Sequence, residues 1–431
     1  MDLGKWAVVA CDQYTAQPEY WQKVARHVGD SPSALNLIFP EVHLGRGDEK
    51  ARIDGIQQKM REYLRDGVLI PQGSGFMYVN RRTAHFKSRK GLIVALDLEC
   101  YDYAPGSHTL IRATEGTVLE RIPPRVGIRS GALLELPHIM ILIDDPERKV
   151  IEPAAEAADR LAEAYSVDLM LGGGHVTGYR VTDEKLNERI HQGLESLADP
   201  DAFNAKYGVQ NQSVLLFAVG DGNHSLATAK TIWEQIKRSG LDARSLSDHP
   251  ARYALAELVN VHDEGLIFEP IHRALFHVSL EDLWAAMASF YQALGMDVSL
   301  AMAAGFAEMR AEITSPRTQN DRAHRIGLIT PGGTGIISIK NPRANLAVGT
   351  LQPFIDSYLK DHSEVEADYI HGDNVVDDLG SHPGNAGFYL PVMAKGDLFK
   401  TVILNGVLPR KTFSMGEAED KRFYLECRKI V

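Results

Sequence analysis

The stretch Val214-Leu-Leu-Phe-Ala-Val-Gly-Asp-Gly-Asn-His-Ser-Leu-Ala-Thr-Ala-Lys230 changes character twice along its length. Residues 214–219 are all apolar and predict a short buried strand. Residues 220–225 contain two glycines and predict a tight turn, because bulky side chains could hardly follow such a backbone. From Leu226 onward apolar residues recur at helical spacing, and Gly240 is expected to end the helix. The stretch therefore predicts a strand, a turn and a helix in direct succession.

The 220–225 turn has the composition of an anion site. A strand that passes through glycines into a helix presents free backbone N–H groups and the positive end of the helix dipole. Such a place suits a phosphate. Asp221, His224 and Ser225 add side chains that can exchange protons or bind a metal. An ordinary junction between a strand and a capped helix would read the same way, so the turn alone leaves both interpretations open.

The length and charge of the chain restrict the class of protein. With 431 residues, of which 44% are apolar and 24% charged, the chain predicts a globular protein of two or three domains. There are 46 Lys and Arg against 57 Asp and Glu, which gives a net charge of −11. This balance argues against a general binder of nucleic acid or of anionic membranes, because phosphate backbones demand a basic surface. We therefore expect a small-molecule partner, and no nucleic acid or membrane.

The cysteines and the apolar runs predict a cytoplasmic location. Cys11, Cys100 and Cys427 form neither a C-x-x-C pair nor a disulfide framework, which is typical of a reducing compartment. The sequence shows no signal-peptide pattern and no apolar run long enough to span a bilayer. It carries no signal for an oligomeric state.

Hydrophobic periodicity predicts an alternation of strands and helices. We expect strands at residues 6–10, 34–39, 76–79, 91–96, 139–143, 167–171, 175–181 and 253–261. We expect helices at residues 20–28, 52–66, 152–165 and 182–197, with a hairpin at the glycines of residues 172–174. After residue 278 a helix capped by Ser279 opens a compact α+β section.

These elements predict a mixed α/β, or α+β, protein of two or three lobes. Residues 1–110 would form an N-terminal α/β region. Residues 111–277 would form a core region that contains the 220–225 turn. Residues 278–431 would form a C-terminal α+β region whose tail could return to the site.

Polar side chains elsewhere could complete a site. Asp12 and Gln13 follow the first strand, and strand ends in α/β folds commonly face ligands. Arg125 follows a segment rich in glycine and proline, and an arginine can clamp a phosphate or simply pair with neighbouring glutamates. His272 and Arg273 are expected just past another short strand, as a second anion contact or as ordinary core hydrogen-bonding groups.

Several segments, in this order along nearly the whole chain, together resemble the family known as domain of unknown function 1015 (DUF1015). They are Ala10-Cys-Asp-Gln-Tyr-Thr, Ala34-Leu-Asn-Leu-Ile-Phe-Pro-Glu, Thr114-Glu-Gly-Thr, Val219-Gly-Asp-Gly-Asn-His-Ser, Glu269-Pro-Ile-His-Arg and Pro409-Arg-Lys-Thr-Phe.

The resemblance implies a ParB/sulfiredoxin-like core built on the strand–turn–helix. The central motif of the family usually reads Ala-Asp-Gly-His-His-Arg, as in the wider group of ParB, sulfiredoxin and free serine kinase, whose enzymes hold a nucleotide or pyrophosphate there. Asp221, Gly222 and His224 match this motif. Asn223 replaces the first His and Ser225 replaces the Arg, which removes one fixed positive charge from the turn.

The resemblance further implies a small-molecule phosphotransferase that phosphorylates free L-serine with pyrophosphate, ADP or ATP, with Mg²⁺ bridging the phosphates. We expect Asp221, His224 and Glu115 to be catalytic, with Glu115 or Asp221 as the base. The other implied contacts divide into phosphate-binding and substrate-binding residues. The phosphate-binding set is Gly222, Asn223, Ser225, Arg125, Arg273 and Lys411, and the substrate-binding set is Asp12, Gln13 and His272.

Three other functions fit parts of the pattern. A non-catalytic sensor of a nucleotide or phosphometabolite could use the same turn, and the missing His and Arg favour it. A ParB-like nucleic-acid-binding protein or nuclease is disfavoured by the net charge. A sulfiredoxin-like reductase is disfavoured because the sequence has no cysteine in or near the turn.

Overall fold

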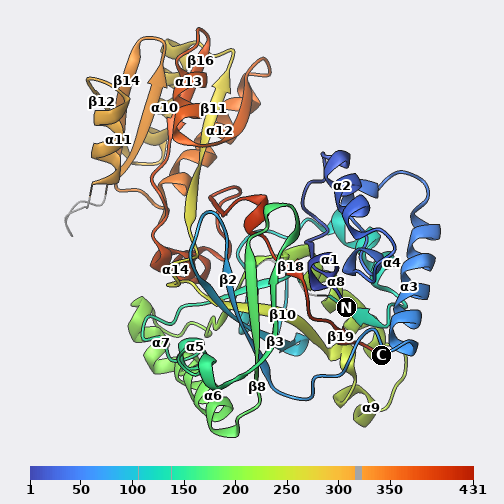
Figure 1. Ribbon diagram of the computed structural model, residues 1–431. Helices are drawn as coiled ribbons and strands as arrows, with labels where there is room; N and C mark the ends of the chain where they lie inside the picture. The colour runs from blue at the N-terminus through green and yellow to red at the C-terminus, as the bar shows by residue number, and fades with distance from the viewer. Residues whose placement is uncertain (105, 137, 316–322) are drawn as a thin grey trace. The chain divides into compact units, whose positions relative to one another are not determined.

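The computed structural model describes residues 1–104, 106–136, 138–315 and 323–431 and divides them into two compact units (Figure 1). Unit 1 comprises residues 1–266 and 416–431, and unit 2 comprises residues 267–415. Helices and strands mix in both units, which confirms the mixed α/β class predicted from the sequence. None of the described helices is long and apolar enough to cross a membrane.

The described part of unit 1 is built on an eight-stranded mixed sheet, in which two strand pairs are parallel and the others antiparallel. In spatial order its strands are β4 (Ile111–Ala113), β9 (Phe217–Asp221), β6 (Met140–Ile143), β10 (Tyr253–Asn260), β3 (Arg89–Asp97), β2 (Phe76–Arg82), β8 (His175–Val181) and β7 (Ala162–Asp168). The helices of unit 1 are α1 (Leu3–Trp6), α2 (Pro18–Val28), α3 (Glu49–Arg65), α4 (Ile122–Arg129), α5 (Glu152–Glu156), α6 (Glu184–Ala198), α7 (Pro200–Tyr207), α8 (Asn223–Lys237) and α9 (Ala243–Ser247).

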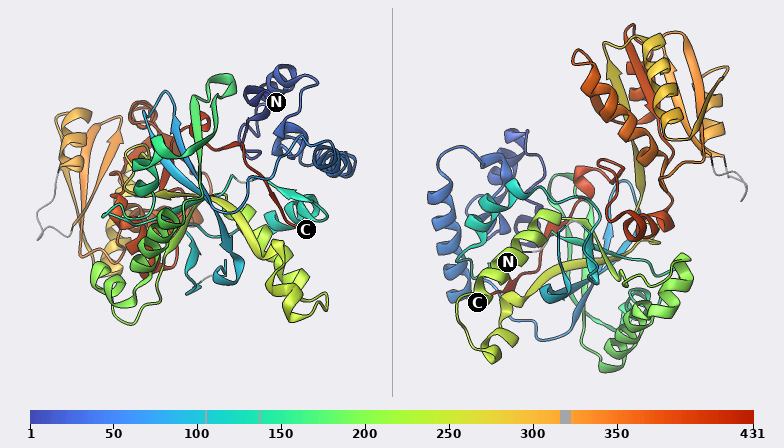
Figure 2. Two further views of the ribbon diagram at one scale, coloured as in Figure 1. Left: turned by 60° about the horizontal axis from the view of Figure 1, so that its bottom comes forward. Right: turned by 180° about the vertical axis from the view of Figure 1, so that it is seen from behind.

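Helix α8 is anchored to the sheet by its apolar face. Leu226, Ala229 and Trp233 are buried in one core cluster with Ile141 and Val219 of the sheet. The periodicity from Leu226 thus did identify the buried face. Helix α6 (green) covers another part of the same sheet. It lies apart from α8 (yellow-green) in the views of both Figure 1 and Figure 2.

The strand–turn–helix is confirmed, but the helix begins at Asn223, three residues earlier than the apolar pattern indicated. The residue before it, Gly222, has φ 76° and ψ 26°, a left-handed conformation. A Cβ added to Gly222 would lie 2.9 Å from the Cα of Ile139. Glycine is therefore required here both by the backbone angle and by the approach of the neighbouring chain.

The C-terminal tail, residues 416–431, belongs to unit 1. Its strands β18 (Phe423–Tyr424) and β19 (Arg428–Lys429) pair with β1 (Val8–Val9) and β5 (Leu134–Glu135). Arg422 in the tail donates to Glu257 of β10 at 2.6 Å, and both side chains are buried.

Two buried arginines of the sheet also hold the tail. Arg81 of β2 donates to the carbonyl oxygen of Glu419 at 2.6 Å, and Arg89 of β3 donates to that of Asp420 at 3.1 Å. Because these guanidinium groups are buried, their hydrogen bonds fix the tail firmly on the sheet.

The described part of unit 2 contains a seven-stranded antiparallel sheet. Its strands are β12 (Asp297–Met302), β14 (Gly333–Lys340), β13 (His324–Thr330), β16 (Asn385–Tyr389), β11 (Phe268–Phe276) and β15 (Glu366–His371), with β17 (Phe413–Met415) added to β11. Its helices are α10 (Leu280–Ala293), α11 (Phe306–Thr314), α12 (Ala347–Asp361), α13 (Asp373–Gly380) and α14 (Lys395–Asn405). Ser279 caps α10 as predicted, by accepting from the backbone N–H of Asp282.

Two predicted elements are wrong. Residues 34–39 form no strand: a 3-10 turn spans Ala34–Asn36, because the Ser33 hydroxyl caps it by accepting from the N–H of Leu35. The helix predicted for residues 152–165 ends at Glu156, and residues 162–168 instead form strand β7. Pairing of β7 with β8 outweighs the helical propensity of the alanines.

One sheet of unit 1 contains strands from two of the expected regions. Strands β2 and β3, from residues 1–110, share one sheet with β4 and β9, from residues 111–277. His272 and Arg273, expected just past a strand, lie within β11.

Substitution of Gly222 tests the requirement for glycine. Gly240→Ala meets nothing within 4 Å at φ 85°, so it should cost only the left-handed backbone strain of about 1–2 kcal/mol. Gly222→Ala carries the same strain and the clash with Ile139, so we expect a loss at least ~1 kcal/mol larger. Urea unfolding of the two variants measures the difference, and equal losses would contradict the packing described above.

Candidate functional site

The 220–225 turn is held against the loop of residues 114–118. The Asn223 side-chain amide donates to the Glu115 carbonyl oxygen and to the Thr117 hydroxyl, each at 3.1 Å. The backbone N–H of Val118 donates to Nε2 of His224 at 3.2 Å. Asn223, which replaces the first His of the family motif, thus holds this loop in place through its two hydrogen bonds.

His224 is neutral at neutral pH. Burial lowers its pKa, and the positive charges of Arg125 and Arg121 lower it further. Because Nε2 accepts a hydrogen bond from Val118, the proton of the neutral ring lies on Nδ1. His224 can therefore offer one N–H donor to an anion, but no charge.

Asp221 forms an ion pair with a lysine that no sequence motif marks. Nζ of Lys421 lies 2.9 Å from Oδ2 of Asp221, and Oδ1 accepts from the N–H of Gly222 at 2.9 Å. Burial raises the pKa of Asp221, but the charge and the hydrogen bond of Lys421 outweigh it and leave the pKa below its ordinary value. Asp221 is therefore ionised at neutral pH and is a weak base.

Arginines of the α4 region supply further positive charge. Helix α4 packs against α8, which brings Arg125 close enough to lower the pKa of His224. One guanidinium nitrogen of Arg125 pairs with Glu41, and another donates to the Arg121 carbonyl at 2.8 Å. Arg125 was predicted from the sequence, whereas Arg121 and Lys421 were missed. Lys421 could not have been found, because 200 residues separate it from Asp221.

A chain of hydrogen bonds leads from the turn toward the N-terminal segment. The Ser225 hydroxyl lies 2.9 Å from Nε2 of His138, and Nδ1 of His138 lies 2.8 Å from the Tyr424 hydroxyl. Asp12, predicted to bind substrate, has Oδ2 at 3.9 Å from Nε2 of His138. The Gln13 side chain donates to Asp12 at 3.1 Å. The structure therefore brings both of these predicted residues to the turn and adds His138 and Tyr424.

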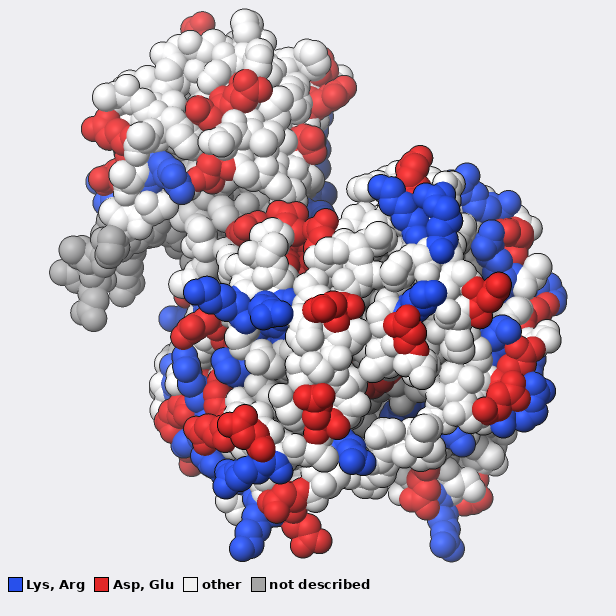
Figure 3. All heavy atoms as spheres, in the orientation of Figure 1, with Lys and Arg blue, Asp and Glu red and all other residues white. Residues whose placement is uncertain are grey.

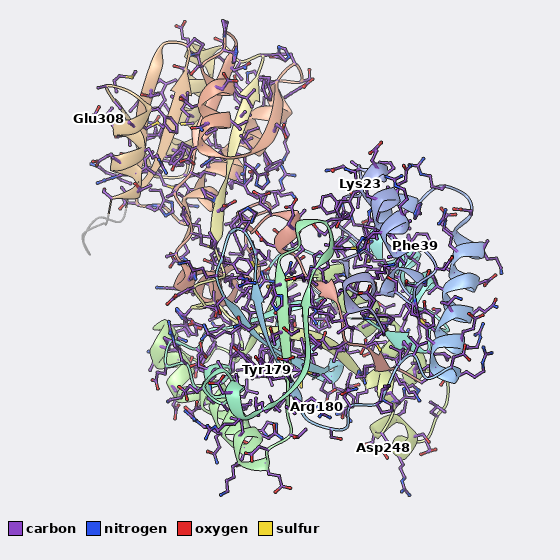
Figure 4. All side chains as sticks on the ribbon, viewed as in Figure 1. Lys23, Phe39, Tyr179, Arg180, Asp248 and Glu308 are labelled. Atoms are coloured by element: carbon purple, nitrogen blue, oxygen red, sulfur yellow. The ribbon has the colours of Figure 1, made fainter. Side chains whose placement is uncertain are left out.

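A cavity of about 150 Å³ lies beside this chain of hydrogen bonds. Ser225, His138 and Tyr424 line it together with the Glu41–Arg125 pair. The rest of the wall is mainly apolar and includes Phe39, Ile56, Met60, Ile128, Leu136 and Leu255. Figure 4 labels Phe39, in the N-terminal part of unit 1 near helix α2, which carries Lys23.

Unit 2 contains three of the predicted site residues, His272, Arg273 and Lys411. The hydrogen bonds described for them are made to other residues of unit 2. His272 is fully buried; its Nδ1 accepts from the N–H of Leu390 at 3.1 Å, and burial lowers its pKa to about 4. Arg273 is also buried and donates to the Gln352 side chain at 2.7 Å and to the Lys411 carbonyl at 3.1 Å. Packing of unit 2 accounts for the geometry of both residues, while the Lys411 side chain is exposed.

The described residues contain no group of three or more His, Cys, Asp or Glu side chains placed to hold a metal ion. Asp221, the acid of the turn, already has both oxygens engaged. These residues do not fit a metal held by the protein alone.

Removal of Lys421 should destabilise unit 1 in a pH-dependent way. We expect Lys421→Met to lose about 1–2 kcal/mol of unfolding free energy at pH 7, because the partly buried pair contains a charged hydrogen bond. The folded pKa of Asp221 is lowered, so this stabilisation is present above the unfolded pKa of about 4 and is lost as the pH falls through the folded value. Urea unfolding from pH 7 to pH 3 should show the difference from wild type shrinking.

Lys50→Met is the matched control, since Lys50 pairs with Asp54 on the surface and is 89% exposed. Its loss should stay within about 0.5 kcal/mol at both pH values. A loss in Lys421→Met that does not vary with pH would contradict the ion pair with Asp221.

Arg273 and Lys411 should behave differently on substitution. Arg273→Met leaves several buried oxygens without a donor, so we expect the opening free energy of unit 2 to fall by about 2–4 kcal/mol. Lys411→Met should change it by less than about 0.5 kcal/mol. Hydrogen exchange read separately for peptides of each unit measures both, and equal protection in the two variants would disprove the packing role of Arg273.

Comparison with known proteins assigns the chain to a family. Among solved structures, one free serine kinase variant, solved in complex with AMP and in complex with ADP, shares 9% identity at a TM-score of 0.38 in both complexes, over 82% of this chain and 95% of that one. A conserved hypothetical protein from Pyrococcus furiosus shares 10% identity at a TM-score of 0.35, over 79% of this chain and 95% of that one. No curated protein sequence matches. The family model described as a protein of unknown function, DUF1015, matches residues 2–358, and the chain therefore belongs to the DUF1015 family.

Proposed function

We propose that unit 1 is a phosphotransferase that binds the phosphates of pyrophosphate or of a nucleotide at the 220–225 turn. The observation that carries this proposal is the start of helix α8, which no side chain caps and which lies among Lys421, Arg125 and Arg121. The N–H groups of a first helical turn and its dipole attract a phosphate, and the neighbouring cations add the charge that Ser225 cannot supply. The acceptor is a small hydroxyl compound, and free L-serine is the first to test.

The charges of the turn suit a donor with several phosphate oxygens. The ammonium group of Lys421 has three donors, and its contact with Asp221 uses one of them. Asp221 thus holds Lys421 in place while the remaining donors serve the phosphate. The Nδ1 proton of His224 adds a neutral donor. Phosphoryl transfer needs mainly such positioning and charge neutralisation.

Glu115 is the better of the two acids for the base. Its loop is tied to the turn through Asn223, and its side chain is exposed to an incoming acceptor. Asp221 is the weaker base because its pKa is lowered by Lys421. Since the described residues do not fit a resident metal, Mg²⁺ would enter bound to the donor phosphates, as part of the substrate.

The family motif supports the same site. Asp221, Gly222 and His224 stand where the motif has Asp, Gly and the second His, and Glu115 and Thr117 belong to the Thr114-Glu-Gly-Thr segment that also carries the resemblance. The two departures are compensated: Asn223 holds the loop of Glu115, and Lys421 and Arg125 replace the lost Arg as sources of charge.

Turnover is tested by ³¹P NMR with L-serine and pyrophosphate, ADP or ATP. We expect Glu115→Gln to lower kcat by about 10²–10⁴, the usual contribution of a general base. Lys421→Met should mainly weaken donor binding, and Arg125→Met should do the same. Glu120→Gln, which changes an exposed acid of the same region, is the control and should retain wild-type turnover. A wild-type kcat in Glu115→Gln would remove Glu115 from the mechanism.

A sensor that binds the phosphates without turnover is the second candidate. The specific observation in its favour is that Asn223 and Ser225 both use their polar groups inside the protein, on the 114–118 loop and on His138. Calorimetric binding of pyrophosphate, ADP or ATP without any phosphorylated product would favour the sensor.

Nucleic-acid binding and reductase chemistry have less support. On the face drawn in Figure 3, basic and acidic side chains are interspersed over unit 1, which does not favour a nucleic-acid groove. Burial and the charge of Asp12 raise the pKa of Cys11 to about 12. A thiol that stays protonated is a poor nucleophile, which disfavours reductase chemistry at Cys11.

A further inference from the structure

The cavity beside Ser225 has the size and lining of a pocket for an apolar group. A cavity of about 150 Å³ lined by aliphatic and aromatic side chains can hold a benzene-sized molecule. Ile56 and Met60 come from α3, Ile128 from α4 and Leu255 from β10, so four separate segments, Phe39 included, converge on it. Free serine has no apolar group of this size.

The charged residues around the cavity are already paired with one another. Glu41 pairs with Arg125, and Arg129 lies 2.6 Å from Glu135, which also accepts from Arg428 at 2.7 Å. The lining thus contains two acids and two bases in ion pairs. A ligand with a charge of its own would have to break one of these partly buried pairs, which is costly. The cavity therefore favours a ligand without charge.

The polar corner of the cavity is formed by Ser225, His138 and Tyr424. The Ser225 hydroxyl can donate and accept at once, and His138 between the two hydroxyls keeps it in place. A single hydroxyl on the ligand would satisfy this corner. It would also lie next to the start of α8, where the phosphates of the donor are proposed to bind.

We propose that this cavity binds a small neutral alcohol that carries a phenyl- or isobutyl-sized apolar group, with its hydroxyl at Ser225 and His138. Phosphorylation of this alcohol rests on the proposed function, whereas its binding in the cavity is independent of that function. In the transfer, the alcohol oxygen bonds to one phosphorus of pyrophosphate as the bridging P–O bond breaks, phosphate leaves, and the alcohol proton passes to His138, whose Nε2 lies 2.9 Å from the Ser225 hydroxyl.

Binding is tested on the full chain with benzyl alcohol and 3-methylbutan-1-ol, by ligand-observed NMR titration. Glycerol, which lacks the apolar group, and benzoate, which has the ring and a negative charge, should each bind at least tenfold more weakly. No binding of benzyl alcohol, or benzoate binding as tightly as benzyl alcohol, would overturn the proposal.

Two substitutions fill the cavity from two positions, one within α4 and one just after its end. Ile128→Phe and Ala132→Leu should each weaken benzyl alcohol binding at least tenfold. Ile232→Phe, the same change on a half-buried position of α8 outside the cavity lining, should leave binding unchanged. Circular dichroism and thermal unfolding show whether each variant is folded. If one filling variant does not fold, the other still tests the proposal. Equal binding in wild type and both folded filling variants would place the ligand elsewhere and overturn the proposal.

A second readout separates this inference from the proposed function. With pyrophosphate present, ³¹P NMR detects benzyl phosphate and phosphoserine. Binding of benzyl alcohol without either product supports the cavity ligand and counts against the phosphotransferase. Phosphoserine formation that is unaffected by Ile128→Phe, in a protein that does not bind benzyl alcohol, supports the phosphotransferase and overturns the cavity ligand.

Discussion

The buried ion pair between Arg422 and Glu257 is the interaction on which the arrangement of unit 1 depends. It ties the C-terminal tail to strand β10, and Arg81 and Arg89 add hydrogen bonds from β2 and β3. A buried charge that loses its partner is strongly destabilising, so each of these groups keeps the others in place. The pair secures the segment that delivers Lys421 to the turn and Tyr424 to the cavity.

The start of helix α8 serves two environments because neighbouring residues on a helix point in different directions. Successive side chains are separated by about 100° around the helix axis. His224 therefore faces the 114–118 loop, while Ser225 faces His138 and the cavity. In the proposed reaction, one helix start would thus hold the charged donor beside His224 and the uncharged acceptor beside Ser225, at adjacent positions.

Local sequence predicted those parts of the candidate site that are close together in the chain. The glycines and the apolar period located the strand, the turn and the buried face of α8, and the residues after the first strand, Asp12 and Gln13, do lie near it. The missed residues, Lys421, His138 and Tyr424, reach the turn only through tertiary contacts, and nothing in their own neighbourhoods distinguishes them. The error at residues 152–165 has the same origin, because strand pairing decided a segment whose composition favours a helix.

The placement of the tail after unit 2 has a consequence for the order of assembly during synthesis. The sheet of unit 1 acquires its last strand, β10, by residue 260, whereas the tail emerges only after residues 267–415 have been made. Since domains tend to fold as they leave the ribosome, the sheet can form before the tail has been made. At that stage Arg81, Arg89 and Glu257 lack the hydrogen bonds and the ion pair that the tail provides. A nascent chain at this stage would hold the 220–225 turn without Lys421, so the phosphate affinity proposed for the turn would arise only after unit 2 has been made.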